Sequence, residues 1–210
     1  MSIKSFISIN SGVNPGVNTN RGPTMWGFIN KVFAYKFFDD LIFIYPLYAV
    51  MFEDYGLSIL QISLIFAVWS ATSFIFEVPS GILADKYSRK HLLIIGQLFR
   101  ILGYLIWVVF PGFTGFLTGI VLWGIKGSLS TCTLNAMIYD NLKAYNQEAE
   151  YTRILGKMKS ISMLAIIISS LSVSLIFSLG YTFVIISSII SLVISSIFLL
   201  MIKGVNNTIN

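Results

Sequence analysis

The sequence is poor in charge. Only 11% of its residues are Asp, Glu, Lys or Arg, whereas a typical soluble domain has about 25%. A soluble globule with so few charged side chains would have almost nothing with which to cover its surface. The composition therefore excludes an ordinary soluble domain. Because 56% of the residues are hydrophobic, it predicts a chain that is solvated mainly by lipid.

Cysteine and histidine are almost absent. The single cysteine, Cys132, cannot form an intrachain disulfide, and no zinc-ligand spacing surrounds it or the single histidine, His91. No phosphate-binding loop, metalloprotease motif or nucleophile elbow is present. We therefore expect no enzyme, no metal and no cofactor. Cys132 is expected to pack as a small hydrophobic side chain, and His91 to lie at the lipid headgroups.

Long hydrophobic runs are what the sequence has instead. Each is near the ~20 residues that a helix needs to cross a ~30 Å hydrocarbon core, and open strands are excluded because lipid cannot satisfy their backbone. The runs lie at about 28–52, 59–82, 91–110, 114–138, 160–179 and 182–202. They predict an all-α membrane protein, a bundle of six transmembrane helices over 28–203. We expect a flexible cytoplasmic tail over 1–27 and a short one over 204–210.

Several residues mark the ends of these helices. Ser58 and Gln61 form a capping-box pattern at the start of the second helix. Pro111-Gly112 separates the third helix from the fourth, and Gly180 divides an apolar stretch about twice the length of one span. Two prolines are expected to kink helices from within, Pro46 in the first and Pro79 in the second.

Basic residues lie on one side of the predicted membrane. The connections after the first, third and fifth helices contain no Lys or Arg, and the first of them carries Glu53 and Asp54. The net charge of +5 comes from the opposite side, which carries Lys4, Arg21, Lys31, Lys86, Arg89, Lys90, Lys143, Arg153, Lys157, Lys159 and Lys203. This asymmetry predicts that both termini are cytoplasmic. Because the basic residues form no single stripe, no nucleic-acid partner is expected.

The connection between the second and third helices carries a spaced motif, Gly81-Ile82-Leu83-Ala84-Asp85-Lys86-Tyr87-Ser88-Arg89-Lys90. It resembles the major facilitator superfamily signature G-x-L-A-D-[RK]-x-G-R-[RK], which lies at this place in the topology. Ser88 replaces the second glycine, which argues against a left-handed backbone there. The matching residues are Gly81, Leu83, Ala84, Asp85, Lys86, Arg89 and Lys90.

In that superfamily the motif latches the two halves of the transporter during alternating access. The resemblance implies that these residues form a gating latch, with Gly81 permitting close backbone approach. The Asp85 carboxylate is expected to accept hydrogen bonds from a helix N-terminus or to form an ion pair with Arg89. The alternative is that the lysines and arginine only anchor the loop at an anionic leaflet.

Three further segments resemble one bacterial branch of the superfamily, which places the chain in a bacterial cytoplasmic (inner) membrane. They are Gly56-Leu57-Ser58, Glu77-Val78-Pro79-Ser80-Gly81 and Ala136-Met137-Ile138-Tyr139-Asp140.

Ionisable residues inside predicted spans are costly and usually face a cavity or a partner. Lys36 and Asp40 are four residues apart, and Asp39 is three from Lys36, so either pair fits on one helix face. In the superfamily, helices one and four line the central cavity. The resemblance therefore makes Asp39, Asp40, Lys36 and Lys126 candidate substrate or proton sites. The alternative is that they form structural ion pairs.

Two other charges are assigned a structural role. Arg100, near the middle of the third helix, is expected to pair with Glu77 of the second helix or with an aspartate. The resemblance places the third helix in support, outside the cavity.

Aromatic and hydroxyl side chains allow weaker hypotheses. The aromatics either stack on a substrate or anchor the chain at the membrane interfaces. The serines of the last two helices, which include Ser188 and Ser195, are expected to serve helix packing. The aromatic candidates are Tyr35, Tyr45, Tyr48, Trp69 and Trp123.

The resemblance implies a secondary transporter of a small solute that works by alternating access. Superfamily members usually have twelve spans in two six-helix halves, so this chain resembles an N-terminal half. Its expected partners are the lipid bilayer, the solute, and a C-terminal half chain or a second copy. The alternative is a truncated, non-transporting membrane fragment or interaction partner. The chain lacks the G-P-x-x-G-G run of many drug antiporters, which argues against drug efflux.

Overall fold

Helices make up most of the part of the chain that the structure describes. The computed structural model describes residues 25–202, and the two predicted tails lie mostly outside them. No strand occurs between residues 25 and 202, so the all-α class is confirmed for that range. The helices are α2 (Met25–Asp40), α3 (Tyr48–Asp54), α4 (Ile59–Lys86), α5 (Arg89–Val109), α6 (Phe113–Ala144), the 3₁₀ turn η1 (Glu148–Glu150), α7 (Tyr151–Phe177) and α8 (Tyr181–Met201).

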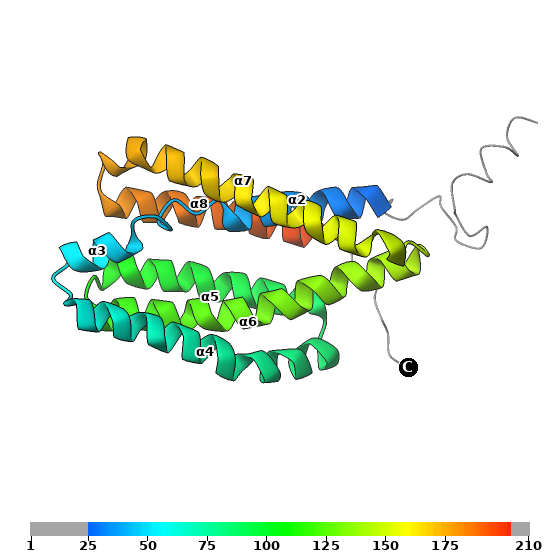
Figure 1. Ribbon diagram of the computed structural model, residues 1–210, viewed down its shortest axis with the longest axis horizontal. Coiled ribbons are helices and arrows are strands. Elements are labelled where there is room, and N and C mark those ends of the chain that lie inside the picture. Colours follow the sequence, from blue (N-terminus) through cyan, green and yellow to red (C-terminus); the bar gives the residue numbers. More distant parts are fainter. Residues whose placement is uncertain (1–24, 203–210) are drawn as a thin grey trace, which may run out of the picture.

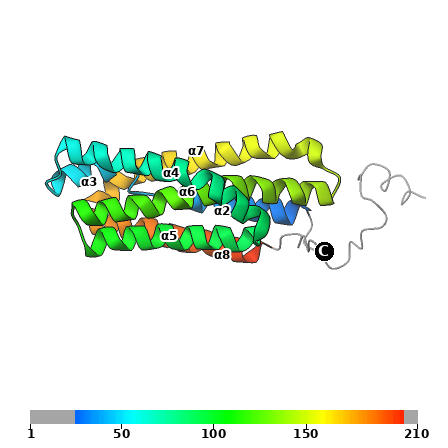
Figure 2. The same ribbon diagram turned by 90° about the horizontal axis from the view of Figure 1, so that it is seen from below.

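The helices form two layers with their long axes roughly parallel. Helices α2, α7 and α8 form one layer, and α4, α5 and α6 form the other (Figure 1). Packing of α5 against α8 joins the layers, and the short α3 lies at one end of the bundle (Figures 1 and 2). The first and last described helices therefore pack side by side.

The first predicted span is not one continuous helix. Helix α2 ends at Asp40, α3 begins at Tyr48, and residues 41–47 between them are non-helical. Pro46 lies in this break, so the prediction of a kink inside a helix is wrong there. A proline lacks an N–H and collides with the carbonyl four residues earlier, which stops a helix unless other groups satisfy the backbone. Helix α2 begins at Met25, three residues before the predicted boundary.

Most of the other predicted boundaries are confirmed, but α6 continues to Ala144, six residues past the predicted end, and α7 begins at Tyr151, nine residues before the predicted start. Ser58 caps α4. Its hydroxyl accepts a hydrogen bond from the backbone N–H of Gln61, and Gln61 Oε1 accepts one from the backbone N–H of Ser58 at 2.9 Å. Pro111-Gly112 separates α5 from α6, and Gly180, at φ +91°, separates α7 from α8. Pro79 lies inside α4 as predicted.

Four helices of the described part are long and apolar enough to cross a membrane: Ile59–Ala84, Arg89–Val109, Glu148–Phe177 and Tyr181–Met201. They correspond to the second, third, fifth and sixth predicted spans. The first is divided, and α6 is rich in Gly, Ser and Thr and carries Lys126, so a count of six apolar spanning helices is not confirmed. Large apolar side chains of α4, such as Phe74 and Val78, are more than 70% exposed, as expected for residues that face lipid.

Glycines set the separation of α5 and α6. A Cβ added to Gly103 would lie 3.0 Å from the carbonyl oxygen of Gly119, and one added to Gly119 would lie 2.1 Å from Nε1 of Trp107. The two backbones can approach this closely only because neither residue has a side chain. Small residues have this role at many membrane helix interfaces.

We expect Gly119→Ala to destabilise the protein, because overpacking a tight contact costs about 1–3 kcal/mol. The matched control is Gly127→Ala in the same helix, where an added Cβ meets nothing within 4 Å. Thermal unfolding of both variants in detergent would measure the difference. Equal melting temperatures for the two variants would contradict the proposed packing.

Candidate functional site

A layer of buried polar side chains lies between two apolar clusters. Along α2, Asp39 falls between Tyr35 of one cluster and Ile42, just beyond the helix end, of the other. The same order holds on α5, where Arg100 falls between Leu93 and Tyr104. Lys126 of α6 and Ser195 of α8 are flanked by the two clusters in the same way. The layer therefore crosses the bundle between its two ends.

Asp39 is at the centre of this layer. Its side chain is only 2% exposed, and it accepts hydrogen bonds from donors on two other helices. Lys126 Nζ lies 2.9 and 2.8 Å from its two carboxylate oxygens, and Gln97 Nε2 lies 2.8 Å from one of them. Arg100 Nη1 lies 3.3 Å from the same oxygen as Gln97. One carboxylate thus joins α2 to α5 and α6.

The neighbouring charges on α2 form a second, more accessible pair. Lys36 Nζ lies 2.8 Å from Asp40 and 3.5 Å from Asp39, as the spacing of these residues predicts. The Ser162 hydroxyl of α7 also bonds to Asp40. The side chains of Lys36 and Asp40 are 23% and 13% exposed, so they form the edge of the layer.

Arg100 is the most enclosed cation of the layer. Of the two partners expected for it, Glu77 and an aspartate, its ion-pair partner is Asp39, while Glu77 is exposed on α4. Nη2 bonds to the Tyr45 hydroxyl, and the guanidinium carbon lies 5.5 Å from the ring centroid of Trp123. Arg100 is therefore held by a carboxylate on one side and by aromatic rings on the other.

Side chains also satisfy the backbone where α2 ends. The carbonyl of Asp39 accepts from Arg100 Nη1 at 3.0 Å, and that of Phe38 accepts from the Ser191 hydroxyl at 2.8 Å. In the break, the amides of Phe43 and Ile44 donate to the hydroxyl of Ser188 at 3.0 and 3.2 Å. Helix ends leave such groups without partners, and lipid supplies none. The serines of α8 thus stabilise the break through hydrogen bonds, in addition to their expected role in helix packing.

The layer contains more cations than anions. Lys36, Arg100 and Lys126 contribute three positive charges, whereas Asp39 and Asp40 contribute two negative ones, which leaves a formal excess of +1. Buried charges normally occur in pairs because desolvation is costly. An excess charge at this depth is a feature that a ligand of opposite sign can neutralise.

The latch motif lies at one end of the bundle, where α4 ends and α5 begins. Arg89 pairs with Asp140 of α6, and Lys90 Nζ donates to the carbonyls of Leu200 and Ile202 at the end of α8. Lys31 of α2 also reaches α8, at 3.1 Å from the carbonyl of Met201. Arg89, Lys90 and Lys31 are therefore joined to neighbouring helices.

The other motif residues are placed as follows. Ala84 is buried, Leu83 and Lys86 are exposed, and the Asp85 side chain is outside the described part. A Cβ added to Gly81 would meet nothing of the described chain within 4 Å, so the close backbone approach there stays a prediction. Ser88 has φ −57° and is not left-handed, as its replacement of glycine predicts.

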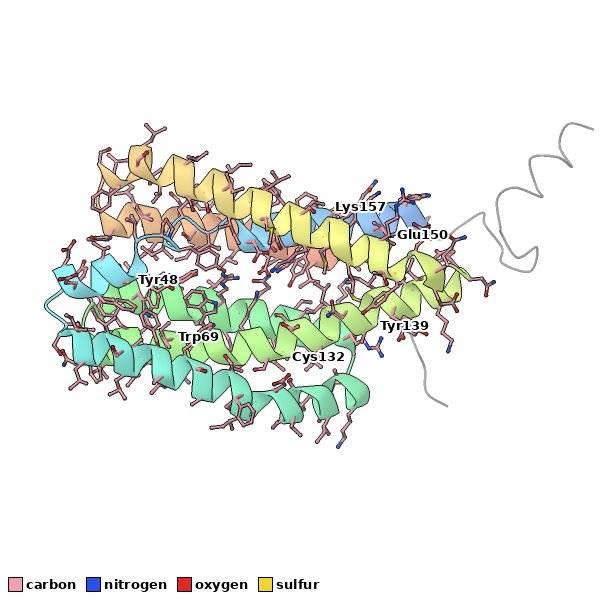
Figure 3. All side chains as sticks on the ribbon, in the orientation of Figure 1. Tyr48, Trp69, Cys132, Tyr139, Glu150 and Lys157 are labelled. Atoms are coloured by element: carbon pink, nitrogen blue, oxygen red, sulfur yellow. The ribbon has the colours of Figure 1, made fainter. Side chains whose placement is uncertain are left out.

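Four of the five aromatic candidates line one pocket. It has a volume of about 210 Å³ and is lined by Tyr45, Tyr48, Phe66, Trp69, Ile120 and Trp123. Tyr48 comes from α3 and Trp69 from α4, and both lie in the half of the bundle that carries α3 (Figure 3). The fifth candidate, Tyr35, is fully buried in the apolar cluster at the other end.

Cys132 is exposed on α6, so the prediction that it packs as a small hydrophobic side chain is wrong. His91 is exposed, and its position at the lipid headgroups stays a prediction. No group of His, Cys, Asp or Glu within residues 25–202 is arranged to hold a metal ion. Sequence reasoning missed Gln97, whose position three residues before Arg100 on an apolar helix could have revealed it.

Comparison with known proteins shows two similarities. Residues 33–208 match the sequence model of the Major Facilitator Superfamily. The chain is also 28% identical over 109 residues to a protein of Buchnera aphidicola subsp. Schizaphis graminum (strain Sg) that is described as an uncharacterized transporter. The match includes 52% of this chain and spans 27% of that relative's length.

We expect Asp39→Asn to destabilise the protein strongly, because removing one partner of a buried ion pair leaves uncompensated charge at a cost of about 3–5 kcal/mol. The double variant with Lys126→Met should recover part of the lost stability, because Asp39 and Lys126 form a direct ion pair. Thermal unfolding of the single and double variants in detergent would measure this coupling.

Glu150→Gln is the control, because the Glu150–Arg153 pair lies at the surface, with side chains 35% and 67% exposed. It should change stability by less than about 1 kcal/mol. Strictly additive effects of Asp39→Asn and Lys126→Met would show that the buried pair does not couple these helices.

Proposed function

Because this chain belongs to the Major Facilitator Superfamily, whose model matches most of its length, we propose that it transports a small solute across a membrane by alternating access. The family points to transport rather than to catalysis. We further propose that the chain acts as one half of a larger unit, in the arrangement of two facing halves that such transporters use. Both proposals go beyond the family assignment.

The observation that carries the proposal is the buried charged layer at the break in the first helix. Ionisable residues inside a membrane bundle usually mark a substrate or ion pathway. Discontinuous helices near the middle of the membrane form such sites in several transporter folds. Here the break after Asp40 lies beside Asp39, Lys126 and Arg100. We therefore retain Lys36, Asp39, Asp40 and Lys126 as candidate substrate or proton sites, with Arg100 as their structural partner.

The contacts of the motif support the proposal of a gating latch. The Arg89–Asp140 pair and the bonds of Lys90 to α8 connect α5 with α6 and α8 at one end of the bundle. Charged contacts at a helix end can be broken and remade with little change in packing, because they involve few buried apolar groups. We propose that Asp85 and Lys86 take part in the same latch.

We expect Asp85→Ala to reduce transport by at least about tenfold, which corresponds to the loss of one charged contact worth about 1.4 kcal/mol in the limiting step. Purified protein in proteoliposomes would be tested for uptake of radiolabelled sugars, amino acids and carboxylic acids. Glu53→Ala removes an exposed carboxylate at the opposite end and should leave uptake unchanged. If Asp85→Ala transports as well as the unaltered protein, the latch role is refuted.

The proposed location is a bacterial inner membrane, with both termini in the cytoplasm. The basic ends of α6 and α7 support this orientation, since Lys143, Lys157 and Lys159 are exposed. Figure 3 shows Lys157 toward this end of the bundle. The alternative function is that of a non-transporting fragment or interaction partner. This alternative is considered because the matched segment spans only 27% of the relative's length.

A membrane-impermeant lysine cross-linker distinguishes these possibilities. In inside-out vesicles we expect it to join two chains, or this chain and a six-helix partner, through lysines such as Lys157. In intact spheroplasts we expect no such product, because the lysines then face inward. A strictly monomeric chain in both preparations would favour the fragment, and a product in spheroplasts alone would reverse the proposed orientation.

A further inference from the structure

The aromatic pocket, formed by the non-helical break, α3, α4 and α6, has a size that limits its ligand. Its volume of about 210 Å³ is below the roughly 300–1,000 Å³ of pockets for drug-sized molecules. A single ring with a small substituent is a suitable occupant. Trp69 forms an accessible part of the pocket wall, since its side chain is 42% exposed, whereas Ile120 is fully enclosed.

The rings around the pocket present both faces and edges. Tyr45 and Trp123 are stacked, with centroids 5.4 Å apart and planes 13° apart. Tyr48 is edge-on to Trp123 at 5.9 Å and to Phe66 at 5.5 Å. Aromatic side chains prefer a ring as a neighbour in stacked or edge-to-face contact, which adds to the gain from burial. The lining therefore favours a planar, aromatic ligand over a saturated one.

The protein charge near the pocket determines whether the ligand is an anion or a cation. An aromatic box can bind an organic cation through its ring faces. Here a protein cation already occupies this position, because the Arg100 guanidinium carbon lies 5.4 Å from the Tyr45 centroid and 5.5 Å from that of Trp123. No lining residue carries a carboxylate. A second cation would be repelled by Arg100, and an anion would be attracted.

The neighbouring charged layer also favours an anionic ligand. Arg100 belongs to the group of three cations and two carboxylates whose formal excess is +1. Its Nη2 bonds to the hydroxyl of Tyr45, a residue that also lines the pocket. The Tyr45 hydroxyl thus links the pocket to one of the three cations of this group.

We propose that this pocket binds a small aromatic monoanion, with its ring among Tyr48, Trp69 and Trp123 and its carboxylate toward Tyr45 and Arg100. The inference names the substrate class of the transporter proposed above and so rests on that proposed function.

Equilibrium binding of radiolabelled benzoate to the purified full chain in detergent tests the proposal without requiring transport. Benzoate should bind at least about tenfold more tightly than two competitors of similar size, the saturated cyclohexanecarboxylate and the cationic benzamidinium. Competition that favours the cation would overturn the assignment of charge. Equal competition by the saturated acid would overturn the assignment of an aromatic ligand, and no benzoate binding by folded protein would overturn both.

Trp69→Ala tests the location, because this exposed residue can be removed with little effect on the core. It should weaken benzoate binding by at least about tenfold, whereas Trp26→Ala, which removes a 57% exposed tryptophan at the start of α2, should not. Unchanged binding by Trp69→Ala would overturn the site. Benzoate binding without uptake of any solute would refute the transport function alone, and uptake of other solutes without benzoate binding would refute the substrate class alone.

Discussion

The Asp39 carboxylate is the group on which the arrangement of the bundle depends. It is nearly inaccessible to solvent, and donors from α5 and α6 converge on it. A buried carboxylate without such partners would cost several kcal/mol, and so would the buried Lys126 and Arg100 without the carboxylate. Each member of the set is therefore tolerated only when the helices that carry the others are in place. This mutual requirement specifies which helices meet between the two apolar clusters.

The break in the first helix follows from the same constraint. Arg100 can reach the carbonyl of Asp39 only because α2 ends there and releases that carbonyl from a helical hydrogen bond. Tyr45, which lies in the break, bonds to the same guanidinium and stacks on Trp123. The same non-helical segment thus contacts the charged layer and contributes Tyr45 to the lining of the aromatic pocket.

Local chemistry in the sequence was sufficient to predict some of these features. The Ser58 cap, the separation at Gly180 and the pairing of Lys36 with Asp40 depend on residues close in the chain, and each is found. The break after Asp40 was not predicted, because Ser188, which satisfies its amides, lies about 145 residues away. Exposure of Cys132 could not be predicted from an apolar run either, since composition does not show which face of α6 meets its neighbours. The roles of the latch and of the charged residues remain predictions.

The serines of α8 have a consequence for biosynthesis. The amides of Phe43 and Ile44 emerge from the ribosome early, but their acceptor, Ser188, is translated 144 to 145 residues later. At about 5–20 residues per second, the interval is roughly 7 to 30 seconds. During that time the break cannot have the partner that it has in the finished protein, and lipid does not replace it. The first segment must therefore wait in a provisional conformation, or in a water-accessible channel of the insertion machinery, until the last helix arrives.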